Sequence, residues 1–128
     1  MKKFATFTSP VAFVSLLFAS LLIVQAGCDK NEENNPPSCK ITSPEDGAEI
    51  TIGSVITITV EAQDPDGKID EVRFYIDDVN VGTTYSLPYS YEWDTGNEAL
   101  GNHSVKAQAI DDKYKGGTDK ITVNIIEN

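Results

Sequence analysis

The chain of 128 residues has few of the side chains that carry catalysis. It contains one histidine, His103, and no Gly-x-Ser-x-Gly, no Walker loop, no His-Glu-x-x-His and no Cys-x-x-Cys. A catalytic set needs a nucleophile beside a base, or a group of metal ligands, and neither is visible here. The sequence therefore predicts a protein that is not an enzyme, in which His103 is a structural imidazole.

Positive charge is also scarce, with 10 Lys and Arg against 20 Asp and Glu, a net charge of −10. Lys2 and Lys3 fall in a segment that we expect to be removed, so 10 − 2 = 8 basic residues and a charge of −12 remain. A field of this sign repels phosphate backbones. Nucleic acid is therefore not an expected partner.

No hydrophobic run is long enough for a membrane-spanning helix of about 20 residues. The longest is 11–24, fourteen residues that follow Lys2 and Lys3 and precede the small residues Ala26 and Gly27. A positive start, a short apolar run and small residues are typical of a cleaved signal peptide. We expect residues 1–27 to be that peptide.

The string Ala26-Gly27-Cys28 resembles the lipobox of bacterial lipoproteins, although Gln25 stands where that family usually has an aliphatic residue. The resemblance implies that Cys28 is lipidated and anchors the chain to a membrane. Residues 29–33 (Asp-Lys-Asn-Glu-Glu) resemble an outer-membrane surface-export signal, which implies a surface-exposed protein of the outer membrane; the alternative is a plain solvated linker. With Cys28 lipidated, Cys39 has no disulfide partner and is expected to be a small buried hydrophobe.

Residues 28–37 read as a polar linker, and residues 38–128 as one all-β domain. In 54–63, apolar Ile56, Ile58 and Val60 alternate with polar residues, which is typical of a half-buried strand. Roughly seven such segments, separated by turn residues, predict an antiparallel β-sandwich with Greek-key connections. Trp93 is expected in its core.

Several motifs resemble a bacterial immunoglobulin-like domain of the type found in secreted glycoside hydrolases and surface proteins. They are Asp64-Pro65-Asp66-Gly67, Val72-Arg73-Phe74-Tyr75, the segment 88–94, Gly101-Asn102-His103 and Ala109-Ile110-Asp111. The resemblance implies an immunoglobulin-like sandwich. The sequence departs from the family at Asp78, because the family usually has Asp-Gly where this chain has Asp77-Asp78. The bend at these two residues is therefore expected to be longer or more mobile than in the family.

Four aspartates suggest a calcium site. In such a sandwich the loop between the second and third strands lies at the same end as the loop between the last two strands, which would bring Asp64 and Asp66 near Asp111 and Asp112. Calcium takes six to eight oxygen ligands, many of them carboxylate. The alternative is that Asp-Pro-Asp-Gly serves only as a turn.

Two tyrosines, Tyr75 and Tyr85, are the residues that we expect to bind a ligand, because exposed aromatic rings stack on sugars. The leading hypothesis is a non-enzymatic, membrane-tethered cell-surface lipoprotein that acts as an adhesion, spacer or complex-assembly module. The alternative is an accessory glycan-binding lipoprotein that serves polysaccharide capture or uptake. Because about nine residues, a reach of roughly 30 Å, separate Cys28 from the domain, the acidic loops are expected to face the membrane.

Overall fold

The computed structural model describes residues 32–128. Of these, Asn34–Asn128 form one compact unit, the folded domain. The predicted signal peptide and the predicted lipidation site at Cys28 lie outside the described residues. Within 32–128, no helix is long and apolar enough to cross a membrane.

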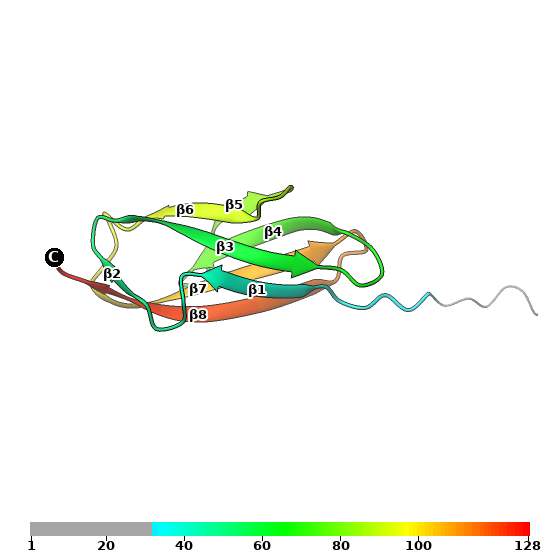
Figure 1. Cartoon of the computed structure of the whole chain (residues 1–128), viewed down its shortest axis with the longest axis horizontal. Coiled ribbons are helices and arrows are strands. Elements are labelled where there is room, and N and C mark those ends of the chain that lie inside the picture. Colours follow the sequence, from blue (N-terminus) through cyan, green and yellow to red (C-terminus); the bar gives the residue numbers. More distant parts are fainter. Residues whose placement is uncertain (1–31) are drawn as a thin grey trace, which may run out of the picture. The chain divides into compact units, whose positions relative to one another are not determined.

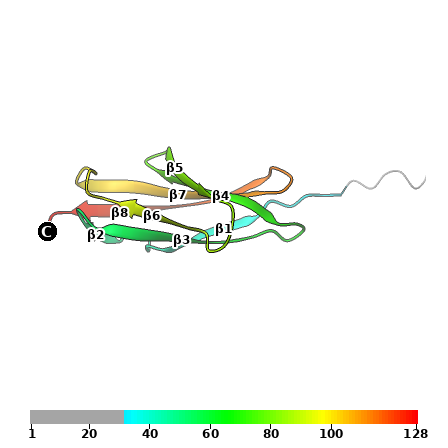
Figure 2. The ribbon, with the colours of Figure 1, turned by 90° about the horizontal axis from the view of Figure 1, so that it is seen from above.

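The domain is a sandwich of two β-sheets, as the alternating pattern predicts (Figures 1 and 2). One sheet has the strand order β1-β3-β6 and the other β2-β8-β7-β4-β5. The strands are β1 (Ser38–Ser43), β2 (Glu49–Thr51), β3 (Val55–Gln63), β4 (Ile69–Ile76), β5 (Val79–Thr84), β6 (Ser90–Asp94), β7 (Gly101–Asp111) and β8 (Gly116–Ile126). The predicted immunoglobulin-like all-β class is confirmed.

One pairing departs from the expected antiparallel arrangement. Strand β2 runs parallel to β8, with Ile50 opposite Ile125, while the other strand pairs of the described domain are antiparallel. The backbone N–H of Ile52 donates to the carbonyl of Ile126 at 2.9 Å, and Ile50 is buried. This short strand therefore lets the chain cross from the first sheet to the second between β1 and β3, and it makes eight strands where about seven were expected.

The inner faces of both sheets fill the space between them. Trp93 of β6 is buried, as expected, and the ring of Phe74 stacks on Tyr91 with centroids 5.7 Å apart. Most of the core comes from alternate positions of five strands: Ile41, Ile58, Val60, Val72, Phe74, Ile76, Val105, Ala107, Ala109, Ile121, Val123 and Ile125. Since this interior is filled, the chemistry of the domain lies at its two ends and on its outer faces.

The folded unit begins four residues before the expected boundary at Ser38. Pro37 is buried, although the segment 28–37 reads as a solvated linker. Its carbonyl crosses β8 at Gly117, where a Cβ atom would overlap the Pro37 oxygen. Gly117 thus allows the chain to enter the domain flat against β8.

Candidate functional site

The two acidic loops meet at one end of the sandwich, as the fold predicts. The loop between β3 and β4 carries Asp64 and Asp66, and the loop between β7 and β8 begins at Asp112. The backbone N–H of Asp112 donates to the carbonyl of Lys68 at 3.1 Å, which joins the loops. The chain also enters the domain at this end (Figure 1).

Asp111 organises the turn between β7 and β8. Its Oδ1 accepts hydrogen bonds from the backbone N–H groups of Lys113 and Lys115, each at 2.8 Å, and its Oδ2 accepts one from Nδ2 of Asn34 at 3.0 Å. Burial raises the pKa of Asp111, but these three donors outweigh it, so the net pKa is lowered. Because its oxygens already accept three N–H groups, Asp111 is the least available of the four aspartates as a metal ligand.

Asp66 holds the start of the domain. Its Oδ2 accepts hydrogen bonds from the backbone N–H of Asn35 at 2.7 Å and from the Asn35 side chain at 3.1 Å. The backbone hydrogen bond from Asn35 lowers the pKa of Asp66. Residues 34 and 35, expected in a solvated linker, therefore bind both acidic loops.

Two oxygens at this end lack a hydrogen-bond donor. Oδ2 of Asp64 and Oδ1 of Asn34 are buried without a partner. The pKa of Asp64 is raised, first by burial, then by a side-chain hydrogen bond with Asp66 and by the charges of Asp66 and Asp111. A Cβ atom on Gly67 would lie 2.6 Å from Oδ2 of Asp64 and 2.7 Å from Oδ1 of Asp112, so both carboxylates face the same point. A hard cation would satisfy these oxygens.

The two tyrosines do not share a surface. Tyr75 donates its hydroxyl to Oε1 of Gln108 at 3.2 Å, and Nζ of Lys106 lies 4.5 Å from its ring centroid, which covers that ring. Tyr75 pairs with Asn80 in the β4–β5 hairpin, whereas Tyr85 follows the far end of β5, about 16 Å further along the strand. Tyr85 is 70% exposed. Of the two, Tyr85 is the one free to stack on a ligand.

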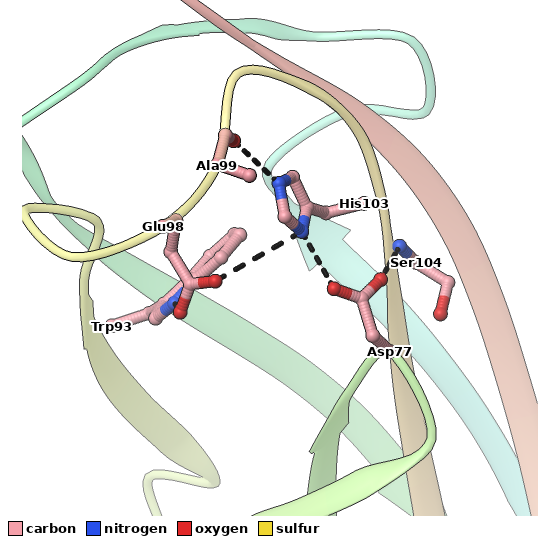
Figure 3. A network of polar contacts seen from close by, with 6 residues as sticks. All are labelled: Asp77, Trp93, Glu98, Ala99, His103 and Ser104. Carbon is pink, nitrogen blue, oxygen red and sulfur yellow. Dashed lines mark hydrogen bonds and ion pairs between the residues drawn. The ribbon is translucent and has the colours of Figure 1, made fainter.

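The opposite end of the domain holds a polar cluster around His103 (Figure 3). His103 is 7% exposed, and its Nδ1 lies 2.6 Å from Oδ2 of Asp77 and 4.0 Å from Oε2 of Glu98. Its Nε2 lies 2.7 Å from the carbonyl oxygen of Ala99. Both ring nitrogens therefore face oxygen acceptors, which a protonated imidazole can satisfy together.

The second oxygen of each carboxylate is held by an N–H group. Oδ1 of Asp77 accepts the backbone N–H of Ser104 at 2.9 Å, and Oε1 of Glu98 accepts Nε1 of Trp93 at 3.2 Å. Among residues 32–128, Asp77, Glu98 and His103 form the one set of three acidic, His or Cys side chains whose donor atoms all lie within 4.8 Å of one another. The four aspartates of the other end do not converge this closely.

Protonation of His103 is favoured by its neighbours. Burial lowers the pKa of His103, but the carbonyl of Ala99 and the carboxylate of Asp77 raise it by more than burial lowers it. The net pKa is therefore above its ordinary value. For Asp77, burial raises the pKa, while the N–H of Ser104 and His103 lower it more, and the net pKa is lowered. In the absence of a metal the pair is therefore an imidazolium and a carboxylate near pH 6.

The turn that carries Asp77 is shorter than expected. Strand β4 ends at Ile76 and β5 begins at Val79, which leaves a two-residue turn with φ of 49° at Asp77 and 67° at Asp78. Aspartate tolerates this left-handed region better than most residues. The N–H of Asp77 also donates to the carbonyl of Ser104 at 2.9 Å, so contacts to β7 fix the turn.

Comparison with known proteins identifies the family. Residues 37–107, more than half of the chain, match the family described as bacterial Ig domain. The chain belongs to this family. A comparison of this bacterial Ig domain with curated proteins found no match.

Solved structures similar to this bacterial Ig domain include fibronectin(III)-like modules, a mannanase and carbohydrate-binding modules. The fibronectin(III)-like modules of CbhA from Clostridium thermocellum are 30% identical, with a TM-score of 0.66, over 72% of this chain and 47% of that one. The endo-beta-1,4-mannanase from Thermotoga petrophila is 18% identical, with a TM-score of 0.59, over 94% and 25%. Carbohydrate-binding modules of the beta-sandwich superfamily are 21% identical, with a TM-score of 0.58, over 74% and 36%.

These similarities concern parts of larger proteins. This bacterial Ig domain spans about half of the CbhA chain and a quarter of the mannanase chain. The similarities under 25% identity show the fold alone. Neither the family nor the neighbours identify Asp77 and Glu98 as companions of His103, which sequence reasoning also missed. The signal was weak, because the three residues belong to a turn, a loop and a strand that only the fold brings together.

Proposed function

We propose that the protein is a non-catalytic, membrane-tethered surface module, anchored by a lipid on Cys28, that serves adhesion, spacing or complex assembly. The observation that carries this proposal is the fixed entry of the chain. Asn34 and Asn35 bind the acidic loops through Asp111 and Asp66. Five residues lie between Cys28 and Asn34, a reach of about 20 Å from one Cα atom to the other, so a lipid on Cys28 would keep this end of the domain near the bilayer.

Such a tether gives the two ends different roles. Asp111 follows His103 by eight positions along β7, which places the His103 end about 26 Å from the acidic end. With the acidic end toward the bilayer, the turn at Asp77 and the loop between β6 and β7 would face outward. A docking partner, a protein or a glycan at the surface, would therefore meet these loops or the outer faces of the sheets first.

The anchor is tested by replacing Cys28 with alanine in the full chain and expressing it in the producing bacterium. We expect Cys28→Ala to lose both incorporation of labelled fatty acid and recovery with membranes. Cys39→Ala is the matched control, because the Cys39 thiol is partly buried in the domain and lies 3.6 Å from the carbonyl of Ala107. Equal labelling of the two variants would contradict the proposal.

A glycan-binding role is the second candidate, and the exposed Tyr85 favours it. Leu87 is exposed two residues later, so an apolar surface of two side chains projects from the loop before β6. The similarity to carbohydrate-binding modules suggests which ligands to examine. In affinity electrophoresis with soluble polysaccharides, Tyr85→Ala should abolish retardation, while Tyr114→Ala, at an 88% exposed residue of another loop, should not. Equal retardation of both variants would contradict a role for Tyr85.

We also propose that calcium binds at the acidic end, through Asp64, Asp66 and Asp112 together with the side-chain oxygen of Asn34. The unpartnered oxygens of Asp64 and Asn34 support this set. Asp111 would stay with its three N–H donors. Calcium there would stiffen the junction between tether and domain.

A further inference from the structure

We propose that Asp77, Glu98 and His103 form a binding site for a divalent transition metal of the zinc class. The ligands are Nδ1 of His103, Oδ2 of Asp77 and Oε2 of Glu98, which lie within 4.8 Å of one another. The site is at the end of the domain opposite the acidic loops. It is distinct from the proposed calcium site in both place and chemistry.

The two distances from Nδ1 of His103 lie on either side of the ligand spacing of a zinc site. Zinc lies about 2.0–2.2 Å from nitrogen and carboxylate oxygen, so tetrahedral ligand atoms are about 3.3 Å apart. Nδ1 of His103 lies 2.6 Å from Oδ2 of Asp77 and 4.0 Å from Oε2 of Glu98. The side chains of Asp77 and Glu98 are 49% and 31% exposed. Each therefore has room to shift by the 0.7 Å that separates these distances from 3.3 Å.

The atoms that would not touch the metal are already held, as metal ligands require. Nε2 of His103 faces the carbonyl of Ala99 at 2.7 Å, which places its hydrogen there and leaves Nδ1 as the free nitrogen. The N–H of Ser104 holds Oδ1 of Asp77, and Nε1 of Trp93 holds Oε1 of Glu98. In Figure 3 the three ligand atoms point toward one another from the β4–β5 turn, the β6–β7 loop and β7.

The ligand set selects the metal. One imidazole and two carboxylates suit zinc and its neighbours in the first transition series, whereas calcium prefers oxygen ligands alone. Two lysines lie near the site. Nζ of Lys106 lies 3.8 Å from Oδ1 of Asp78, which is not a ligand, and the positive charge of Lys120 on β8 lowers the pKa of Asp77. Because the carboxylates are partly exposed, the fourth coordination position is open to water or to a ligand from a partner.

A proton competes with the metal for Nδ1 of His103. Metal ligation requires a neutral imidazole, so binding releases a proton and weakens about tenfold for each pH unit below the pKa of the histidine. A proton and a metal therefore exclude one another at Nδ1 of His103, and we expect weaker Zn²⁺ binding at pH 5 than at pH 7.5.

The test uses the full untagged chain in detergent, with Zn²⁺ titrated at pH 7.5 and at pH 5. Above its dissociation constant, Zn²⁺ should raise the melting temperature by about 5–10 °C for each tenfold increase in concentration at pH 7.5, and much less at pH 5. Co²⁺ should give visible absorption bands and quench Trp93, whose ring centroid is 6.1 Å from that of His103.

Glu98→Gln separates metal binding from structural support, because a glutamine oxygen still accepts the N–H of Trp93. We expect it to weaken Zn²⁺ binding at least tenfold with little change in the metal-free melting temperature. Asp78→Asn, next to the site and outside the ligand set, should bind as the unchanged chain does, and His103→Gln should not bind. The proposal is overturned by a Zn²⁺ shift that survives in both Glu98→Gln and His103→Gln, or by no shift and no Co²⁺ absorption at pH 7.5.

Discussion

The hydrogen bond between Asp77 and His103 predicts a pH-dependent stability that one substitution should remove. Asparagine at position 77 tolerates a φ of 49° and still accepts the N–H of Ser104, so Asp77→Asn removes the charge and keeps the turn. EDTA is present throughout, so that no metal binds Nδ1 of His103 at any pH of the series. The perturbation is then confined to the ion pair.

The sign follows from the directions of the two pKa shifts. Because the pKa of His103 is raised by folding, protonated His103 stabilises the fold fully at pH values below its pKa in the unfolded chain, about 6.5. This contribution is lost as the pH rises through the pKa of His103 in the folded domain. The lowered pKa of Asp77 stabilises the fold above the unfolded value of about 3.9, and this contribution is lost as the pH falls through the folded pKa. The pair therefore contributes most between about pH 4 and pH 6.5.

The magnitude follows from the exposure of the partners. A hydrogen bond to a charged group contributes about 1.5–3 kcal/mol when shielded. The Asp77 side chain is 49% exposed, so solvent screening reduces this to about 1 kcal/mol. For a domain of this size, about 1 kcal/mol corresponds to about 4–8 °C in melting temperature at pH 5.5.

The assay is urea unfolding of the full chain and of Asp77→Asn from pH 5 to pH 9, followed by the fluorescence of Trp93, the single tryptophan. The free energies of unfolding should differ by about 1 kcal/mol at pH 5.5 and converge as the pH rises above the folded pKa of His103. Asp78→Asn is the control for the turn. A difference that stays constant across this range would refute the reasoning, because it would show that the bond does not depend on the charge of His103.

Three further outcomes are expected. Calcium at millimolar concentration should raise the melting temperature and a chelator should reverse the rise, while the double variant Asp64→Asn and Asp112→Asn should respond to neither; no response in the unchanged chain would remove the calcium proposal. Gly117→Ala should lower the melting temperature, because its Cβ atom would overlap the carbonyl oxygen of Pro37. Gly53→Ser is the comparison: the space around its Cβ position is open, but its φ is 88°, so this variant measures the cost of backbone strain without an overlap. Phe74→Ala should cost about 3–5 kcal/mol of unfolding free energy in urea titrations, since Phe74 is fully buried, and a loss below about 1 kcal/mol would mean that its packing on Tyr91 is wrong.

The sequence by itself determined the strands and the content of the core. Alternation with a period of two is a local property, so Ile58 and Val60 could be assigned to one face without knowledge of their partners, and Trp93 followed because a small sandwich needs large inward side chains. The approach of the two acidic loops was also predictable, because it depends only on strand order in this fold. The junction of Asp112 with Lys68 confirms it.

Only the tertiary structure decided which polar groups meet. The pairing of β2 with β8 and the hydrogen bond from Asn34 to Asp111 join segments more than 70 positions apart, and no local pattern specifies such a partner. The same holds for Asp77, Glu98 and His103, and for Lys106, which covers Tyr75. The physical reason is that a side chain's face follows from its own strand, whereas its neighbours follow from the register between strands, which the packing of the whole domain fixes.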